Sequence, residues 1–190
     1  ALLGGAFRTR VAAYGTGCYY PDYYQDTARM LAELAREARG YREAGITAIK
    51  MKVGLLPIDL DAERVAIVRD AIGPSTGLMV DANHAYTSAS AIRIGRALEK
   101  HNALWFEEPV PPEDRQGYRR VREAIDVPIA GGEAEFTRYG FRDLLLGECL
   151  DIAQPDLCCM GGFTEWQKII ALTTSFGVLC IPHVWGSGVA

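Results

Sequence analysis

Short apolar runs alternate with segments of helical periodicity along this chain of 190 residues, and this alternation constrains the fold most strongly. The apolar runs are mostly continuous, as is typical of strands in a parallel sheet covered by helices. The segments between them repeat apolar residues at helical spacing. The expected strands are residues 10–16, 48–54, 78–83, 103–109, 127–133, 151–156 and 178–183, and the expected helices are 27–44, 60–72, 88–100, 115–124, 138–146 and 164–176.

Seven strands in strict alternation with helices predict an α/β fold of the (β/α)8 barrel (TIM barrel) type rather than an open sheet. A closed barrel normally takes about 200 residues or more, so residues 1–190 are interpreted as one partial barrel domain without its eighth strand. The chain has no initiator Met, and we expect it to be an interior piece of a longer chain.

The composition argues against several kinds of partner. A net charge of −4 without a basic run argues against nucleic-acid binding. No apolar run reaches the roughly 18 residues that a membrane helix needs. The five cysteines, which include the adjacent Cys158 and Cys159, are odd in number and do not suggest a disulfide framework. Reduced thiols in a cytoplasmic protein are the simpler interpretation.

Two lysines interrupt the second expected strand in alternate positions. Lys50 and Lys52 should point to the same side of the sheet, because successive side chains of a strand alternate between its faces. An amphipathic edge strand with a wet face would explain them, since lysine is almost never fully buried without a partner. The later strand ends favour a functional site instead. Nearly all of them carry ionisable or amide side chains, namely Asp81, Asn83, Glu107, Glu108, Glu133, Asp156 and His183.

Three of these carboxylates recur at equal intervals. Asp81, Glu107 and Glu133 are 26 residues apart, one strand–helix unit each, and parallel strand ends meet at one edge of a barrel. Each alone could be an ordinary strand-end hydrogen-bond acceptor, but together they would repel one another unless a cation lies between them. An all-oxygen set suits Mg²⁺ better than zinc. Glu108 has the opposite parity to Glu107, so only one of them is expected to point inward, and the spacing favours Glu107.

A metal flanked by lysines indicates a reaction. Mg²⁺ bound to a substrate carboxylate acidifies the α-proton, because it stabilises the enolate that forms when this proton leaves. Lys52 is the candidate base, with a pKa expected to be lowered by Lys50 and the metal, and Lys50 is the electrostatic partner. His183 and Asp156 end consecutive strands, and the aspartate would fix the tautomer of the histidine. His183 is either a structural residue or a second base opposite Lys52.

Six short motifs follow one another from Tyr14 onward: Lys50-Met51-Lys52, Val80-Asp81-Ala82-Asn83, Phe106-Glu107-Glu108-Pro109, Gly132-Glu133, Gln154-Pro155-Asp156 with Gly161-Gly162, and Pro182-His183. Together these motifs resemble the mandelate racemase subgroup of the enolase superfamily. The resemblance implies a (β/α)7β barrel, Mg²⁺ held by Asp81, Glu107 and Glu133, and an opposed acid/base pair formed by Lys52 and His183. A lysine base beside Mg²⁺ is an established pattern of that superfamily. Its members also carry an N-terminal capping domain, which we expect this chain to lack.

Three further features concern the substrate. The segment from His183 to Gly188 is similar to galactarolactone cycloisomerase-like members, which implies a substrate contact for Trp185; packing at the barrel rim is the alternative. Asn83 is in phase with Asp81 and is expected to contact substrate. Many relatives have Lys or Arg where this chain has Cys158-Cys159-Met160, so substrate contacts from that loop are not assigned.

The leading hypothesis is a Mg²⁺-dependent lyase that dehydrates a sugar acid to a 2-keto-3-deoxy acid. An isomerase, either a racemase or epimerase or a lactone cycloisomerase, would share the same enolate. A barrel that binds metal and acid without turnover is the third hypothesis, although binding alone needs neither base. The expected partner is a small carboxylate substrate, with no nucleic acid and no membrane, and a homo-oligomer is expected.

Overall fold

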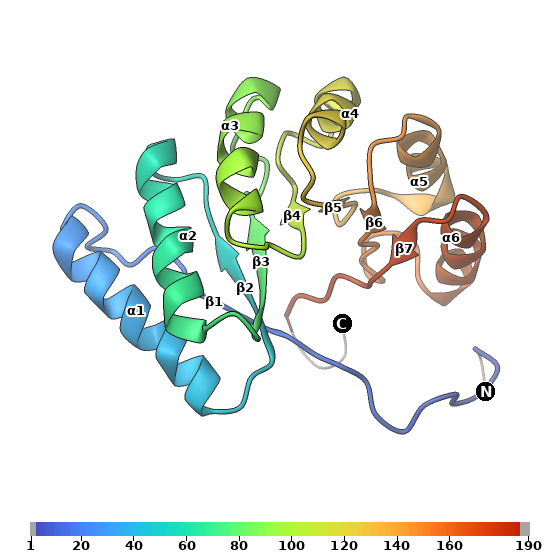
Figure 1. The fold of residues 1–190 in the computed structure, drawn as a ribbon. Helices are drawn as coiled ribbons and strands as arrows, with labels where there is room; N and C mark the ends of the chain where they lie inside the picture. Colours follow the sequence, from blue (N-terminus) through green and yellow to red (C-terminus); the bar gives the residue numbers. More distant parts are fainter. Residues whose placement is uncertain (1–2, 187–190) are drawn as a thin grey trace.

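Seven parallel strands and six helices alternate along residues 3–186, the part of the chain that this computed structural model describes. The strands pair in chain order, each parallel to the next, and the helices lie on the outer side of the arc that they form (Figure 1). The elements are β1 (Gly15–Gly17), α1 (Thr27–Glu43), β2 (Ala48–Lys52), α2 (Ile58–Ile72), β3 (Gly77–Asp81), α3 (Ser88–Glu99), β4 (Phe106–Glu107), α4 (Arg115–Ala124), β5 (Ile129–Gly131), α5 (Thr137–Leu146), β6 (Ile152–Ala153), α6 (Phe163–Ser175) and β7 (Leu179–Cys180).

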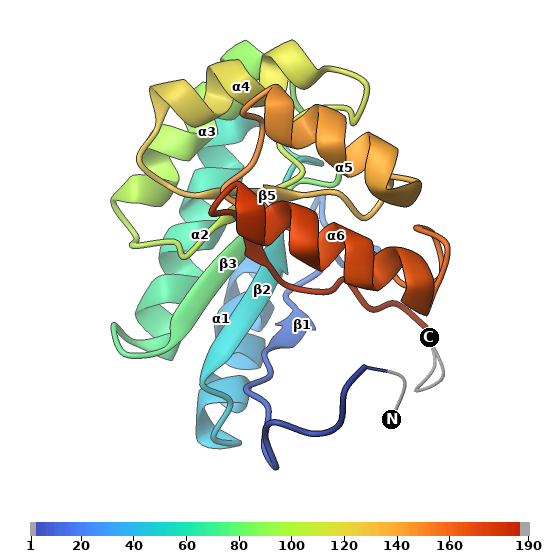
Figure 2. The ribbon, with the colours of Figure 1, turned by 90° about the vertical axis from the view of Figure 1, so that its right-hand side faces the viewer.

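The predicted barrel-type α/β architecture is thereby confirmed, with every expected strand and helix in its place. Within residues 3–186, β1 and β7 are the two edges of the sheet. Helices α5 and α6 lie side by side in front of the later strands in the view of Figure 2. No helix in this range is long and apolar enough to cross a membrane.

The strands are shorter than the apolar runs that predicted them. The run 10–16 is a strand only at its end, in β1. The run 103–109 is a strand only over the two residues of β4, although Leu104 and Glu108 still donate backbone hydrogen bonds to β3 and β5. Two local causes end the ladder after β4: Glu108 has a φ of 44°, outside the extended region, and Pro109 has no N–H to donate. A strand prediction from an apolar run therefore overestimates its length where the chain turns at the barrel rim.

Three of the six described helices, α1, α3 and α4, begin at a side chain that caps them. The side chain of Asp26 accepts a hydrogen bond from the Arg29 N–H at 3.2 Å, and Asp114 accepts one from the Gly117 N–H at 2.9 Å. Such caps satisfy N–H groups that have no partner within the helix.

Side chains alternate between the two faces of the sheet. Leu78 and Phe106 pack toward the helices in the larger core cluster, whereas Met79 and Trp105 belong to a second cluster on the concave face. Tyr14 packs edge-on against Trp105 there, with ring centroids 5.4 Å apart. The base of the concave face is thus filled with apolar side chains, and polar groups are left to the strand ends.

The register of the ladder decides which polar groups become neighbours. Lys50 is paired with Met79, Lys52 with Asp81, and Asp81 with Glu107. Residues paired in a parallel ladder point to the same face, so Lys52, Asp81 and Glu107 form one row across three strands. This row lies at the carboxyl ends of the strands, where the functional residues of such barrels are found.

Replacing Leu78 with Ala should lower the free energy of unfolding by about 2–5 kcal/mol, because its fully buried side chain would leave a cavity between sheet and helices. Leu104 is a matched control: it is 50% exposed, and its N–H donates to the Leu78 carbonyl. Leu104→Ala should change stability by only about 0.5 kcal/mol or less. Urea unfolding measures both, and equal losses would contradict this assignment of the core.

Candidate active site

Lys50 and Lys52 extend to the same side of β2, as their alternate positions require. The Lys50 side chain is only 5% exposed, and its Nζ forms a very short contact with Glu107 Oε1 and lies 3.4 Å from Asp81 Oδ2. Lys52 Nζ donates to the same Asp81 oxygen at 2.5 Å. One fully buried aspartate thus holds both ammonium groups, which explains how two lysines occupy the concave face.

Glu107 is held on its other side by two residues that sequence reasoning missed. Its Oε2 accepts hydrogen bonds from Trp105 Nε1 and from Gln154 Nε2, each at 2.8 Å. Gln154 itself is buried, and its Oε1 has no hydrogen-bond partner among residues 3–186. The available signal was parity, since Trp105 precedes Glu107 by two residues and Gln154 precedes Asp156 by two.

Glu108 is a fourth carboxylate at this rim, contrary to the expectation that only one of the paired glutamates turns toward the other acids. It is 1% exposed, accepts a hydrogen bond from Asn83 Nδ2 at 3.4 Å and lies 3.1 Å from His84 Nε2. Strand alternation does not apply to it because its φ of 44° takes the backbone out of the strand. Asn83 and His84 also have positive φ angles, so the ends of β3 and β4 both carry backbone strain.

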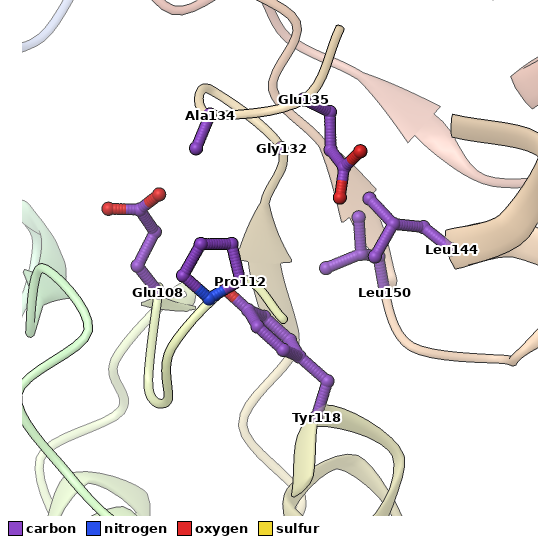
Figure 3. A pocket seen from close by; sticks show the side chains of 8 residues that line it. All are labelled: Glu108, Pro112, Tyr118, Gly132, Ala134, Glu135, Leu144 and Leu150. Atoms are coloured by element: carbon purple, nitrogen blue, oxygen red, sulfur yellow. The ribbon is translucent and has the colours of Figure 1, made fainter. Parts of the chain in front are cut away.

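A small cavity lies behind Glu108, on the side of the strand ends that faces the helices. Its volume of about 10 Å³ is enough for a single water molecule at most. It is therefore too small for a substrate, and the candidate site is the open rim of the concave face. The cavity is lined by Glu108, Pro112, Tyr118, Gly132, Ala134, Glu135, Leu144 and Leu150 (Figure 3).

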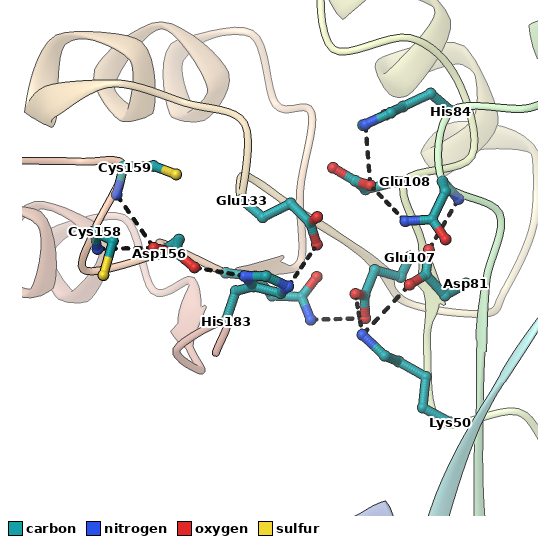
Figure 4. Close-up of polar contacts among 12 residues, drawn as sticks. Lys50, Asp81, His84, Glu107, Glu108, Glu133, Asp156, Cys158, Cys159 and His183 are labelled. Carbon is teal, nitrogen blue, oxygen red and sulfur yellow. Dashed lines mark hydrogen bonds and ion pairs between the residues drawn. The ribbon is translucent and has the colours of Figure 1, made fainter. Parts of the chain in front are cut away.

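His183 and Asp156 are in direct contact beyond the ends of β7 and β6, near the edge of the sheet that lies opposite β2. His183 Nδ1 lies 2.7 Å from Asp156 Oδ2, and His183 Nε2 lies 3.3 Å from Glu133 Oε2 (Figure 4). The other oxygen of Asp156 accepts the backbone N–H groups of Cys158 and Cys159 at 2.8 and 3.2 Å. Burial would raise the pKa of Asp156, but these hydrogen bonds, led by that with His183, lower it. The ring is therefore anchored through Nδ1, and Nε2 faces the carboxylates.

Charge at the centre of the site is unevenly compensated. Burial acts to raise the pKa of Asp81, but Lys50 and Lys52 outweigh it and hold this pKa below its ordinary value. Burial and Asp81 raise the pKa of Glu107 despite Lys50. Burial, followed by the carboxylates of Glu133, Asp81 and Glu107, raises the pKa of Glu108 to about 9. Burial alone would lower the pKa of Lys50, but Glu107 and Asp81 raise it overall.

The fit to a metal ion follows from this electrostatic balance. In the part of the chain that is described, no three or more His, Cys, Asp or Glu side chains are arranged to hold a metal ion. Asp81 and Glu107 are engaged by lysines instead, and Glu133 by His183. The donors are nevertheless all oxygen, and these three carboxylates together with Glu108 outnumber the two lysines beside them. Chemically, the set fits a hard divalent cation.

The two expected substrate contacts are accessible. Asn83 is exposed, and its backbone N–H donates to Asp81 Oδ1 at 2.9 Å. Trp185 is 71% exposed, so within the described residues it is not packed into the barrel rim. Both side chains lie within two residues of a candidate ligand or base in the sequence, Asp81 and His183 respectively.

Comparison with known proteins now bears on this geometry. A family model described as enolase C-terminal domain-like matches residues 33–190. The chain belongs to this family. Its resemblance to the mandelate racemase subgroup of the enolase superfamily is thereby confirmed. A D-galactarolactone cycloisomerase from Agrobacterium fabrum is 45% identical over 188 residues, which are 99% of this chain and 48% of that protein.

Solved structures of this enolase-type family agree. The 3,6-anhydro-D-galactonate cycloisomerase from Zobellia galactanivorans is 45% identical, with a TM-score of 0.89 over 98% of this chain and 50% of that one. An L-talarate dehydratase from Polaromonas sp. JS666, solved with Mg and L-glucarate, is 35% identical, with a TM-score of 0.77 over 82% of this chain and 43% of that one. The chain spans about half the length of the relatives that it matches. These relatives are dehydratases and cycloisomerases, that is, lyases and isomerases.

Replacing Lys50 with Met should lower the free energy of unfolding by about 3–5 kcal/mol in metal-free buffer, because two buried carboxylates lose their shared cation. Lys168→Met is the control, since its pair with Glu165 is partly exposed and should contribute about 1 kcal/mol or less. Adding Glu107→Gln to Lys50→Met should restore part of the loss. Denaturant unfolding that shows equal losses for the two lysine variants would contradict this electrostatic assignment.

Proposed function

We propose that this chain provides the catalytic face of a Mg²⁺-dependent enzyme that removes the proton α to the carboxylate of a sugar acid or its lactone. The observation that carries the proposal is the placement of Lys52 and His183. Each is held by a carboxylate, and Lys52 at the end of β2 and His183 beyond β7 lie on opposite sides of Asp81, Glu107 and Glu133. Two proton-transfer groups flanking an acid-rich centre suit attack on either face of a bound carbon acid.

Asp81, Glu107 and Glu133 are the residues that would hold Mg²⁺. Their shared oxygen chemistry and the magnesium bound in the Polaromonas relative support this assignment. When bound, the ion would stabilise the negative charge that develops on the substrate carboxylate and so acidify its α-proton. Lys50 would remain protonated beside these three side chains and donate a hydrogen bond to the substrate carboxylate.

The chain's own groups would move the protons. Lys52 would take the α-proton from one face of the substrate, and His183 would serve the other face. Asp156 accepts from Nδ1 in this scheme, which leaves Nε2 free to exchange a proton with substrate. Asn83 and Trp185 would contact the hydroxyl-bearing part of the substrate from the exposed rim.

Dehydration is the first candidate for the overall reaction. After the α-proton leaves, the electron pair of the broken C–H bond forms a double bond to the β-carbon, and the β-hydroxyl departs as water with a proton from His183 or Lys52. The resulting enol becomes a 2-keto-3-deoxy acid. The talarate dehydratase among the solved relatives supports this outcome.

Cycloisomerisation is the second candidate, and a specific observation favours it: both 45% identical relatives named above are cycloisomerases. The proton abstraction is unchanged, but the departing β-oxygen belongs to a ring, so the ring opens and no water is lost. Return of the proton on the opposite face without departure of oxygen would give a racemase or epimerase. A non-catalytic binding barrel is less well supported, because binding uses neither Lys52 nor the Asp156–His183 pair as a base.

The same proposal covers the setting of the enzyme. All five cysteines are free thiols, which supports a reducing compartment such as the cytoplasm. Exposed apolar side chains on and beside α5, namely Phe136, Tyr139 and Leu146, support assembly into a homo-oligomer. The partner in catalysis would be a small carboxylate rather than a macromolecule.

Proton NMR in D₂O tests the reaction class directly. The protein is incubated with Mg²⁺ and a panel of aldonic acids, aldaric acids and their lactones. Appearance of a keto-deoxy acid from an open-chain acid establishes the dehydratase, and the same product from a lactone or anhydro acid establishes the cycloisomerase. Loss of the α-proton signal alone indicates a racemase or epimerase. No reaction of any panel member would count against the proposed substrate class.

Substituting either base should strongly lower turnover on the substrate face that it serves, without unfolding the protein. Lys52→Ala and His183→Asn should each lower kcat by at least about 100-fold for the substrate face that they serve, the usual contribution of general acid–base groups. Lys168→Ala, at an exposed lysine of α6, is the control and should leave kcat unchanged. Wild-type turnover in Lys52→Ala would contradict the mechanism.

Metal removal gives an independent check. Dialysis against EDTA should eliminate α-proton exchange, and added Mg²⁺ should restore it, because the carboxylates alone do not stabilise the developing negative charge. Lys52→Ala should not recover on addition of Mg²⁺. Exchange that persists at the wild-type rate after chelation would show that the carboxylates act without a metal.

A further inference from the structure

A second charged pair lies apart from Asp81, Glu107 and Glu133, between α2 and the ends of the first strands. Asp61 and Arg64 are both 0% exposed, and Arg64 Nη1 lies 3.1 Å from Asp61 Oδ1. Buried ion pairs are often replaceable by apolar residues without loss of stability, so stability alone does not account for this pair. Its remaining hydrogen bonds indicate what it holds.

The pair binds the backbone on both sides of Val53, directly after β2. Arg64 Nη1 donates to the Lys52 carbonyl at 2.8 Å, and Asp61 Oδ2 accepts the Gly54 N–H at 2.8 Å. Two consecutive peptide groups at the end of the strand that carries Lys52 are thereby fixed to the helix. Neither contact involves the lysine side chain itself.

The same pair connects the loops that follow the neighbouring strands. Arg64 Nη2 donates to the Cys18 carbonyl at 3.0 Å, and the guanidinium stacks 3.9 Å from the ring centroid of Tyr20. The hydroxyl groups of Tyr20 and Tyr86 donate to the two oxygens of Asp61 at 2.5 and 3.2 Å. The segments after β1, β2 and β3 therefore meet at one buried carboxylate–guanidinium pair.

Close packing leaves the strand end little room to shift. Gly54 has a φ of 110°, and a Cβ placed on it would lie 2.4 Å from the Ala85 Cβ and 3.2 Å from the Ala82 carbonyl oxygen. The turn after Lys52 is thus pressed against the loop that carries Asn83. The position of the Lys52 peptide is set from one side by this loop and from the other by Arg64.

We propose that Arg64 and Asp61 are positioning residues for Lys52, which hold its peptide so that Nζ reaches one face of the substrate. This inference rests on the proposed function, in which Lys52 is one of two bases. A displacement of about 1 Å in a reacting group can cost on the order of 100-fold in rate. Within the described part of the chain, the pair forms no hydrogen bond or ion pair with Asp81, Glu107 or Glu133, so its effect should be confined to the Lys52 side.

The same helix offers a matched control in Arg69. This arginine also donates to backbone carbonyls, from Nε to His101 at 2.9 Å and from Nη1 to Gly73 and Thr76 at 2.8 and 2.7 Å. These acceptors lie in loops that precede strands, at the end of the barrel away from the site. Loss of Arg69 should therefore weaken the fold without moving Lys52.

The experiment measures α-proton exchange in D₂O for two substrates of opposite α-configuration, assigned to the two bases by Lys52→Ala and His183→Asn. Arg64→Met should lower kcat for the Lys52-dependent exchange at least about tenfold, with KM and the His183-dependent exchange changed by about twofold or less. Asp61→Asn should act in the same direction. Arg69→Met should leave both exchange rates unchanged while lowering Tm.

Equal losses on both faces, or no loss in Arg64→Met, would overturn the positioning role. If Arg64→Met does not fold, Arg64→Lys replaces it, because a lysine keeps the charge but cannot donate to the Lys52 and Cys18 carbonyls as a planar fork does. Wild-type protein without Lys52-dependent exchange would overturn the proposed function instead. In that case amide hydrogen exchange decides on the pair: faster exchange across residues 52–55 in Arg64→Met than in Arg69→Met supports it, and equal exchange overturns it.

Discussion

The site depends on the burial of Lys50 between Asp81 and Glu107. Isolated charges in a protein interior are strongly unfavourable, and these three groups are tolerated because the ammonium group of Lys50 partly neutralises both carboxylates across adjacent strands. The register of the parallel ladder brings them together, and the apolar cluster around Met79 and Trp105 fills the concave face beside them. Four carboxylates, those of Asp81, Glu107, Glu108 and Glu133, are gathered here beside two lysines, and burial, reinforced by neighbouring carboxylates, raises the pKa of Glu107 and Glu108. A site with this imbalance suits a bound cation and a negatively charged intermediate.

Around this centre, the packed core and the candidate functional residues lie in different parts of the fold. The helices and the strand interiors form a continuous core, whereas Asn83, His84 and Glu108 adopt positive φ angles where the strands end. Such strained conformations persist only where their surroundings fix them, and here backbone hydrogen bonds from Ala82 to Glu107 and from His84 to Glu108 do so. The buried Asp61–Arg64 pair gives comparable support below Lys52. The backbone that carries Lys52, one of the two proposed bases, is therefore fixed by contacts outside the cluster of carboxylates.

One apparatus can serve the several reactions of the relatives because they share their first step. Dehydratases and cycloisomerases occur among the similar proteins, at 35% and 45% identity. Removal of the α-proton needs a base and stabilisation of negative charge, which in the proposed mechanism come from the strand ends. The later outcome depends on whether the departing oxygen is free or part of a ring, which is a property of the substrate and of the residues that select it. Fold and first step are therefore shared more widely than the product.

The sequence by itself determined the order of strands and helices, the common direction of Lys50 and Lys52, and the equal spacing that brings Asp81, Glu107 and Glu133 to one edge. These features follow from local periodicity and from the rule that parallel strands end at the same side, so no long-range information was needed. Only the tertiary structure decided that Glu108 turns toward the other acids, since this depends on its positive φ. Only it showed that Gln154 binds Glu107 across 47 residues and that Arg64 reaches Cys18 across 46. Such contacts depend on which side chains meet when the sheet curves, and periodicity along the chain does not encode that meeting.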